Sequence, residues 1–304
     1  VSFSSLIPLP SSLILMHQLI FLNNELVNAA KARVAPVSSA LLYGRGVFTT
    51  ISVYGGHAFL WPEHWARLAE HALRAGVDVK QFDEHGTGAS LDELIAANHV
   101  KEGRAHVLLL SSAGRGVWRV KGTASARQTD LLIMTGEAHK TNADGLALTV
   151  SPFRANTFSP LAGVKSVSYL ERILAWEEAR ARKFDEAVTL NERGEIVSAT
   201  MANLFWVKDG TIHTPALQTG AVAGITRAQI IELAHALSIP TVEGVYEIHD
   251  MGDADEIFLT STNLGVAPIN TFDFHRYTLH VGSLTARLRE AFRQLTIVVN
   301  NDED

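Results

Sequence analysis

The sequence predicts a two-domain protein that combines α-helices with β-strands. Its 304 residues suffice for two domains or one large one. Short apolar runs bounded by turn residues are typical of strands, whereas longer segments carry apolar residues at helical spacing. Both kinds occur on each side of a polar segment without periodicity. We therefore expect an α+β or α/β fold with an N-terminal domain over 16–136, a linker over 137–145 and a C-terminal domain over 146–304.

The first fifteen residues precede the expected fold. They are apolar and rich in Ser and Pro, and this segment contains no Lys or Arg before its apolar run. A secretory signal begins with a basic region, and no run approaches the roughly 20 apolar residues of a membrane span. We expect residues 1–15 to form a disordered extension, with a signal peptide as the alternative.

The N-terminal half should contain hairpins, helices and buried strands in that order. Asn and Gly pairs mark the hairpin turns, and Pro62 suits the first turn of a helix that Gly76 ends. Ser90, with Glu93 three residues later, is the expected N-cap of the next helix. The expected segments are hairpins over 17–27 and 46–61, helices over 61–76 and 90–100, and strands over 105–114 and 129–138.

The C-terminal half alternates strands and helices. One helix should contain Lys165 and run to about Arg182, and two hairpins should turn at Glu-Arg-Gly and Lys-Asp-Gly. The last strand of this half should lead into a loop. The other expected segments are strands over 146–153, 186–215 and 256–269, and helices over 224–239 and 281–295.

Composition excludes several classes of function. A formal charge of -6 and a pI near 6.1, with no cluster of Lys and Arg, argue against a nucleic-acid surface. The chain has no cysteine, which excludes disulfides, thiolate catalysis and cysteine-based zinc sites. We expect no metal site, and the lack of cysteine fits a cytoplasmic protein.

Lys165 is the first candidate for a chemical role. It stands alone among small and apolar residues in SPLAGVKSVSYLERI, residues 159–173. Burial disfavours the charged form of an amine and lowers its pKa, which is the condition for a lysine that forms a Schiff base. The alternative is an ordinary surface lysine at the start of a helix.

Two hydroxyl-bearing turns and an arginine could bind phosphate. Ile225 and Thr226, after Gly224, open a predicted helix whose free N–H groups favour an anion. Thr262 follows a predicted strand, and Arg67 could add a charge-assisted contact. Each is ambiguous alone, since a capped helix start or a solvated arginine would look the same. Together with an apolar lysine they are the groups that pyridoxal phosphate requires.

At this point the sequence resembles the class IV aminotransferases, the fold-type IV pyridoxal-phosphate enzymes. This family includes branched-chain and D-amino acid aminotransferases and aminodeoxychorismate lyase. The resemblance covers about residues 17–290, and its motifs occur in the family's order. They are YGRGVFTT, EHWARL, PLAGVKSVSYLERILAWEEA, EAVTLNERGEI, ANLFWVKDGTIHTP, GITR and DEIFLTSTN.

The resemblance implies a fold, a cofactor and a set of site residues. It implies a smaller N-terminal α/β domain, a larger β-barrel-like C-terminal domain with flanking helices, and a homodimer with the cofactor at the domain boundary. Lys165 would form the Schiff base, and Tyr169 would approach the ring hydroxyl. The implied phosphate ligands are Arg67, Ile225, Thr226 and Thr262, with Asn263 beside them, and the implied substrate residues are Tyr43 and Phe48.

Two positions depart from the family's pattern. Most members carry a glutamate five residues before the Asn of the NLF motif, where it binds the protonated pyridine nitrogen; this chain has Ser198 there. Glu195 cannot substitute, because three residues back along a strand its side chain points to the other face. Arg45 stands where lyases and D-amino acid enzymes often have Asp. It could add a cation near the substrate, or simply face solvent.

Three functions stay open on the sequence. The motifs GVFTT and ANLFW resemble those of aminodeoxychorismate lyase, and Arg115 could meet a substrate carboxylate. A hydroxyl at Ser198 makes the ring a weaker electron sink, which elimination tolerates better than transamination. We therefore favour a lyase that releases pyruvate and gives 4-aminobenzoate, with Lys165 as the general base. The alternatives are an aminotransferase for branched-chain, aromatic or D-amino acids, and a cofactor-binding homologue without catalysis.

Overall fold

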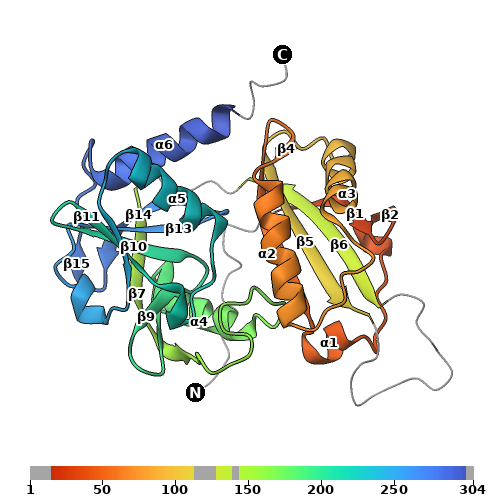
Figure 1. Ribbon diagram of the computed structural model, residues 1–304, viewed down its shortest axis with the longest axis horizontal. Helices are drawn as coiled ribbons and strands as arrows, with labels where there is room; N and C mark the ends of the chain where they lie inside the picture. Colours follow the sequence, from red (N-terminus) through yellow and green to blue (C-terminus); the bar gives the residue numbers. More distant parts are fainter. Residues whose placement is uncertain (1–14, 113–127, 139–143, 299–304) are drawn as a thin grey trace.

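The computed structural model describes residues 15–112, 128–138 and 144–298. Its described strands form two separate sheets, one from each half of the chain (Figure 1). The first sheet uses strands up to residue 137, and the second begins at residue 146. The mixed architecture predicted from the sequence is therefore confirmed.

The first sheet has six strands, and every neighbouring pair in it is antiparallel. The strand order is β2-β1-β6-β5-β3-β4. These strands are β1 (Met16–Leu22), β2 (Glu25–Asn28), β3 (Gly46–Tyr54), β4 (His57–Ala58), β5 (Gly103–Ser111) and β6 (Thr129–Glu137).

The second sheet has nine strands and mixes parallel with antiparallel pairs. Its order is β12-β11-β10-β13-β14-β7-β8-β9, and β15 pairs with β14. β7 runs parallel to both of its neighbours. The strands are β7 (Leu146–Ala155), β8 (Glu186–Asn191), β9 (Ile196–Ala199), β10 (Asn203–Lys208), β11 (Thr211–Pro215), β12 (Thr241–Gly244), β13 (Glu256–Ser261), β14 (Gly265–Phe272) and β15 (His275–Arg276).

Helices cover both sheets. In Figure 1, α2 and α3 lie on the first sheet, and α5 and α6 lie beside the strands of the second. The α-helices are α1 (Ser39–Tyr43), α2 (Trp61–Arg74), α3 (Glu84–Ala97), α4 (Leu170–Ala181), α5 (Ile225–Ala236) and α6 (Leu284–Val298). The 3-10 helices are η1 (Ala29–Lys31), η2 (Leu217–Thr219) and η3 (Ile248–Met251).

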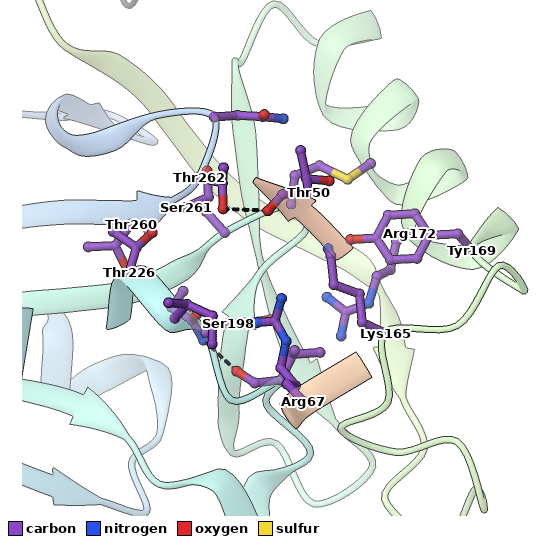
Figure 2. Close-up of a pocket in the computed structure, with 17 residues that line it drawn as sticks. Thr50, Arg67, Lys165, Tyr169, Arg172, Ser198, Thr226, Thr260, Ser261 and Thr262 are labelled. Carbon is purple, nitrogen blue, oxygen red and sulfur yellow. Dashed lines mark hydrogen bonds between the residues drawn. The ribbon is translucent and has the colours of Figure 1, made fainter. Parts of the chain in front are cut away.

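Hydrogen bonds join the two halves along β3. The Thr262 hydroxyl, after β13, donates to the Thr50 carbonyl oxygen at 3.0 Å (Figure 2). The Ser52 hydroxyl donates in return to the Thr262 carbonyl oxygen at 3.1 Å. The backbone N–H of Phe48 donates to the carbonyl oxygen of Lys165 at 3.1 Å. One strand of the first sheet is thus fixed to two loops of the second half.

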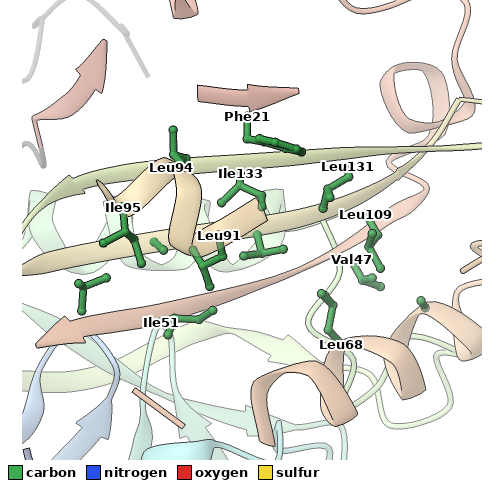
Figure 3. Close-up of a cluster of buried hydrophobic side chains, with 14 of the residues drawn as sticks. Phe21, Val47, Ile51, Leu68, Leu91, Leu94, Ile95, Leu109, Leu131 and Ile133 are labelled. Atoms are coloured by element: carbon green, nitrogen blue, oxygen red, sulfur yellow. The ribbon is translucent and has the colours of Figure 1, made fainter. Parts of the chain in front are cut away.

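The core of the N-terminal half lies between its sheet and helices α2 and α3. Ile51 and Ile133 point from the sheet toward Leu68 of α2 and Leu91 and Leu94 of α3 (Figure 3). In α2 the buried residues recur at helical spacing, as predicted from the sequence. Complete burial of such a side chain contributes about 1.5–3 kcal/mol, so this core holds α2, and with it Arg67, against β3.

Three local predictions were wrong. Helix α3 begins at Glu84 with Asp83 as its N-cap, so Ser90 lies inside the helix, where its hydroxyl donates to the Gly86 carbonyl oxygen. Lys165 lies in the loop before α4, because the helix starts only after Tyr169. The segment after β13 turns at once into another strand, β14, instead of a loop.

None of the described helices combines the length and the apolar character needed to cross a membrane.

Candidate active site

A pocket opens at the junction of the two halves. Thr50 and Arg67 line it from the N-terminal half, and all its other lining residues come from the C-terminal half (Figure 2). These are Lys165, Tyr169, Arg172, Ser198, Met201, Ala202, Asn203, Val222, Gly224, Ile225, Thr226, Thr260, Ser261, Thr262 and Asn263.

Lys165 is held at this pocket by its backbone and surrounded by aromatic rings. Its N–H donates to Nδ1 of His71 at 3.1 Å. Its Nζ atom lies 4.4 Å from the ring centre of Phe48 and 5.3 Å from that of Tyr169. Burial, and after it the positive charges of Arg67 and Arg172, lower the pKa of the amine from 10.5 to about 7. About half of the amine is therefore neutral at pH 7 and able to act as a nucleophile or base.

Arg67 makes two hydrogen bonds and keeps one buried donor group without a partner in the described chain. Its Nη1 donates to the Ala223 carbonyl oxygen and its Nη2 to the Thr49 hydroxyl, both at 2.9 Å. Its Nε is buried and has no hydrogen-bond partner among the described residues. A buried donor without a partner costs about 1–3 kcal/mol, so an anion in the pocket would remove this cost.

Thr49 and His64 fix the position of Arg67. Because the Thr49 hydroxyl accepts from Arg67, its own hydrogen points to Nδ1 of His64, 2.6 Å away. Burial, together with the charges of Arg67 and Lys165, lowers the pKa of His64 to about 3. The imidazole is therefore neutral and carries its proton on Nε2. This buried chain orients the guanidinium without adding a second charge.

The first turn of α5 presents backbone donors to the pocket. Gly224 is the N-cap and no side chain caps the helix, so the N–H groups of Ile225 and Thr226 are open to a ligand. A Cβ on Gly224 would lie 2.0 Å from Oδ1 of Asn203, so only glycine fits there. The amide of Asn203 donates to the Val222 carbonyl oxygen at 3.0 Å and so fixes the approach to this turn.

The wall near Ser198 carries no acid. Among the described residues that line the pocket there is no Asp or Glu. Ser198 is buried, and its hydroxyl donates to the Ala199 carbonyl oxygen at 2.8 Å. Beside it, Nη1 of Arg172 donates to the Thr200 carbonyl oxygen at 3.2 Å. Glu195 instead pairs with Arg193 and Asn191, away from the pocket.

A second cavity of about 530 Å³ adjoins the pocket at Lys165 and Tyr169. Its size fits a small-molecule substrate. Its walls are mostly apolar, and its strongest polar group is Arg104, which is buried and donates to the Asn263 carbonyl oxygen at 3.3 Å. Burial lowers the pKa of Arg104 to about 10, which leaves the group charged at neutral pH. Burial also lowers the pKa of His106 in this cavity to about 4.

The structure brings most of the expected site residues together. Eight of them line the first pocket, and Phe48 lines the adjoining cavity. The eight are Arg67, Lys165, Tyr169, Ser198, Ile225, Thr226, Thr262 and Asn263.

Two of the expected substrate residues are placed differently. Tyr43 and Arg45 line neither cavity of the single chain. Tyr43 ends the short helix α1 and is 45% exposed, and Gly44 in the left-handed conformation then turns the chain, so that the residues of β3 that line the two cavities are Phe48 and Thr50. Arg115 lies outside the described residues.

Sequence reasoning missed Arg172 and Arg104. Arg172 comes one helical turn after Tyr169, and residues three apart on a helix share a face, so the position of Tyr169 was the available signal. Nothing in the sequence distinguished Arg104, because its place beside Asn263 depends on how the two halves meet.

The family model for amino-transferase class IV matches residues 46–272 of the chain. The chain belongs to the class IV aminotransferase family. These enzymes use pyridoxal phosphate, and the pocket fits that cofactor: a lowered-pKa lysine for its aldehyde, and the unpartnered Nε of Arg67 with the open turn of α5 for its phosphate.

Named relatives of this class IV enzyme carry out two kinds of reaction. It is 29% identical to the aminodeoxychorismate lyase of Bacillus subtilis, over 91% of this chain and 94% of the relative. It is also 29% identical to the branched-chain-amino-acid aminotransferase of Escherichia coli, over 90% and 91%. Among solved structures, a branched-chain aminotransferase from Thermoproteus uzoniensis with norvaline superposes with a TM-score of 0.85 at 27% identity, covering 94% of this chain and 97% of that one.

Proposed function

We propose that this class IV enzyme is a lyase of the aminodeoxychorismate type, which eliminates pyruvate and leaves 4-aminobenzoate. The observation that carries the proposal is the acid-free wall at Ser198, next to a lysine whose pKa of about 7 leaves roughly half of it neutral at pH 7. A carboxylate there would hold a proton on the cofactor's ring nitrogen and strengthen the ring as an electron acceptor. Transamination depends on that strength more than elimination does.

The side chains of the two cavities have separable roles in this reaction. Pyridoxal phosphate, when bound, supplies an aldehyde for the substrate amine and a ring that withdraws electrons from the neighbouring carbon. Lys165 would be the base that removes the proton from the substrate carbon that carries the amine. Arg104 offers a buried guanidinium to a substrate carboxylate. Phe48 and Tyr169 flank the Lys165 amine and exclude water from it.

A second candidate is an aminotransferase for amino acids with apolar side chains. The observation that favours it is the largely apolar wall of the adjoining cavity, where Met16, Leu108 and Met134 lie with a single buried arginine. One arginine suits one carboxylate, whereas aminodeoxychorismate carries two.

The two candidates are distinguished by what the enzyme needs to turn over. With aminodeoxychorismate and no amino acceptor, we expect stoichiometric release of pyruvate and 4-aminobenzoate, detected with lactate dehydrogenase and by fluorescence. The variant Lys165→Ala should release neither, because it lacks the base. If instead valine or leucine converts the bound cofactor to its amine form, and aminodeoxychorismate yields no pyruvate, the aminotransferase is correct and the lyase proposal is wrong.

We also propose that the enzyme is a homodimer. Its support is a group of exposed apolar side chains on α1 and at the start of α4, two segments that meet where Gly44 approaches Ser168. The group consists of Leu41, Leu42, Tyr43, Leu170 and Leu174. Monomeric proteins seldom expose contiguous apolar patches of this kind.

A further inference from the structure

The pocket wall at Ser198 is built by a chain of hydrogen bonds that ends in Arg172. Glu186, fully enclosed on β8, accepts from the backbone N–H groups of Thr200 and Met201 and from the Thr200 hydroxyl. Thr200 in turn accepts a hydrogen bond from Nη1 of Arg172 through its carbonyl oxygen, at 3.2 Å. The guanidinium is therefore attached to the strand end that carries Ser198, two residues earlier.

Arg172 has donors left for a ligand. Within the described part of the chain only its Nη1 makes a hydrogen bond, and no ion pair joins Arg172 to an acid. Its Cζ lies 5.8 Å from the ring centre of Tyr169, and Figure 2 shows it at the same opening as Lys165 and Arg67. A guanidinium carries five N–H groups and cannot accept a hydrogen bond. This end of the pocket thus offers N–H donors, a hydroxyl and a positive charge.

A pyridine nitrogen can meet such surroundings in only one favourable way. When protonated it is a cation and a donor, so it needs an acceptor and is repelled by a neighbouring guanidinium. When unprotonated it is neutral and accepts a hydrogen bond. Ser198 cannot serve a protonated ring as a carboxylate would, because its hydroxyl has no negative charge.

We propose that Arg172, together with Ser198, makes this pocket select the cofactor with an unprotonated ring nitrogen. The proposal rests on the proposed function in one respect, namely that position 198 faces the ring nitrogen. It makes Arg172 a specificity-determining residue: a neutral ring withdraws electrons more weakly, so the arginine favours elimination over transamination. Arg67 and the first turn of α5 hold the phosphate, and Arg172 takes no part in that contact.

Cofactor analogues test the proposal without any substrate. Apoenzyme is titrated with pyridoxal phosphate, with the analogue that carries C–H in place of the ring nitrogen, and with the N-methyl analogue, whose ring is permanently cationic. All three share the aldehyde and the phosphate, so differences in dissociation constant report on the ring position alone. We expect the natural cofactor to bind about 10-fold or more tightly than the C–H analogue, because that analogue leaves a charged donor unpaired. The N-methyl analogue should bind most weakly.

Variants assign the preference to Arg172. Arg172→Met should bring the three dissociation constants closer together, since both the donors and the charge are lost. Arg172→Lys should still bind the N-methyl analogue weakly, because the charge remains. This variant tests the role of Arg172 if Arg172→Met does not fold. Arg180→Met is the matched control: it lies on the same helix, pairs with Asp185 at 2.9 Å, and should leave the order unchanged.

The outcomes that overturn the proposal are equally specific. Tight binding of the N-methyl analogue to the wild type, or equal binding of the C–H analogue and the natural cofactor, would show that no donor faces the ring nitrogen. If the ratios of the three dissociation constants are unchanged in Arg172→Met, Arg172 does not cause the preference. None of these results depends on pyruvate release, so the lyase proposal can fail while the binding preference holds.

Discussion

Two effects lower the pKa of Lys165 at once: burial of the amine and the positive charges of Arg67 and Arg172. An amine attacks an aldehyde only when it is neutral. In the apoenzyme, the rate of Schiff-base formation with a phosphate-free aldehyde should therefore rise with pH through a midpoint near 7 and then level off. Stopped-flow absorbance across the pH range measures this midpoint.

The same experiment separates burial from charge. Arg172→Met removes one of the positive charges, so the midpoint should move to higher pH, whereas Arg180→Met should not move it. A midpoint close to the ordinary lysine pKa of 10.5 in the wild type would mean that the amine is solvated and that the site does not activate it.

Residue identity alone could not decide what Lys165 does. Its local sequence fits a surface lysine equally well, and only the distant Arg67 and the turn at Thr226 point to a cofactor. The sequence has Ser198 where most of the family has a glutamate, and no Asp or Glu lines the pocket among the described residues. The signal for Arg172, its spacing of three residues from Tyr169, was missed because which face of α4 meets the pocket depends on where the helix begins, and that start was predicted too early.

At the scale of elements, the turn from β9 to β10 depends on one buried acid. Burial raises the pKa of Glu186 from 4.5 to about 7, against the hydrogen bonds from Thr200, Ala187 and Met201 that lower it. Because the folded-state pKa is the higher one, the stabilising contribution of this group is complete below about 4.5 and is lost as pH rises through about 7. Ionisation of the carboxyl is therefore unfavourable inside the folded turn.

The variant Glu186→Gln should lose this pH dependence while keeping an acceptor for Thr200. Between pH 4.5 and 7 the free energy of unfolding of the wild type should fall by about 3 kcal/mol relative to the variant. Urea unfolding at both pH values measures the difference. The variant's free energy of unfolding is subtracted from that of the wild type at each pH, which removes the contribution of the buried histidines because both proteins share it. The variant Glu178→Gln, at a partly exposed side chain that pairs with Arg182, serves as the control and should show a much smaller change. A constant difference across this range would contradict the burial argument.

Elements with strong local signals were predicted well, and those set by distant contacts were not. Trp61–Arg74 forms a helix as expected, since Pro62 suits its first turn and the apolar residues match one face. Helix α3 begins six residues earlier than Ser90, because Asp83 offers its carboxylate to the N–H of Gly86 at 2.7 Å. The strand β14 was missed because its partners, β13 and the parallel β7, supply the pairing that its own sequence does not indicate.

At the scale of the whole molecule, the pocket is a product of how the two halves meet. Arg67 reaches it from α2 and Lys165 from the loop before α4, and β3 is bonded to both sides of the junction. No pattern within either half predicts this contact. The order of motifs along the chain indicated that the residues belong together, whereas their geometry required the fold.

The oligomeric state also belongs to the whole molecule, and exposed apolar side chains on α1 and α4 bear on it. Leu41 is 62% exposed and Leu170 is 67% exposed. Burial of such an apolar surface by a second copy is favourable, because it removes apolar area from water. We expect the protein to elute as a dimer in size-exclusion chromatography with light scattering. Leu41→Asp combined with Leu170→Asp should shift it toward monomer at micromolar concentration, because burying two unpaired carboxylates is unfavourable.

Leu237→Asp provides the matched control, since Leu237 is 38% exposed and caps the C-terminus of α5, a helix that lies apart from α1 and α4 in Figure 1. It should leave the mass unchanged. A wild-type monomer, or a double variant that stays dimeric, would show that α1 and α4 do not form the interface.

If the dimer does form there, Tyr43 lies within the interface, and its predicted contact with a substrate would be made with the substrate bound to the partner copy. Loss of affinity for substrate in Tyr43→Phe, with cofactor affinity unchanged, would then support a site completed by two chains.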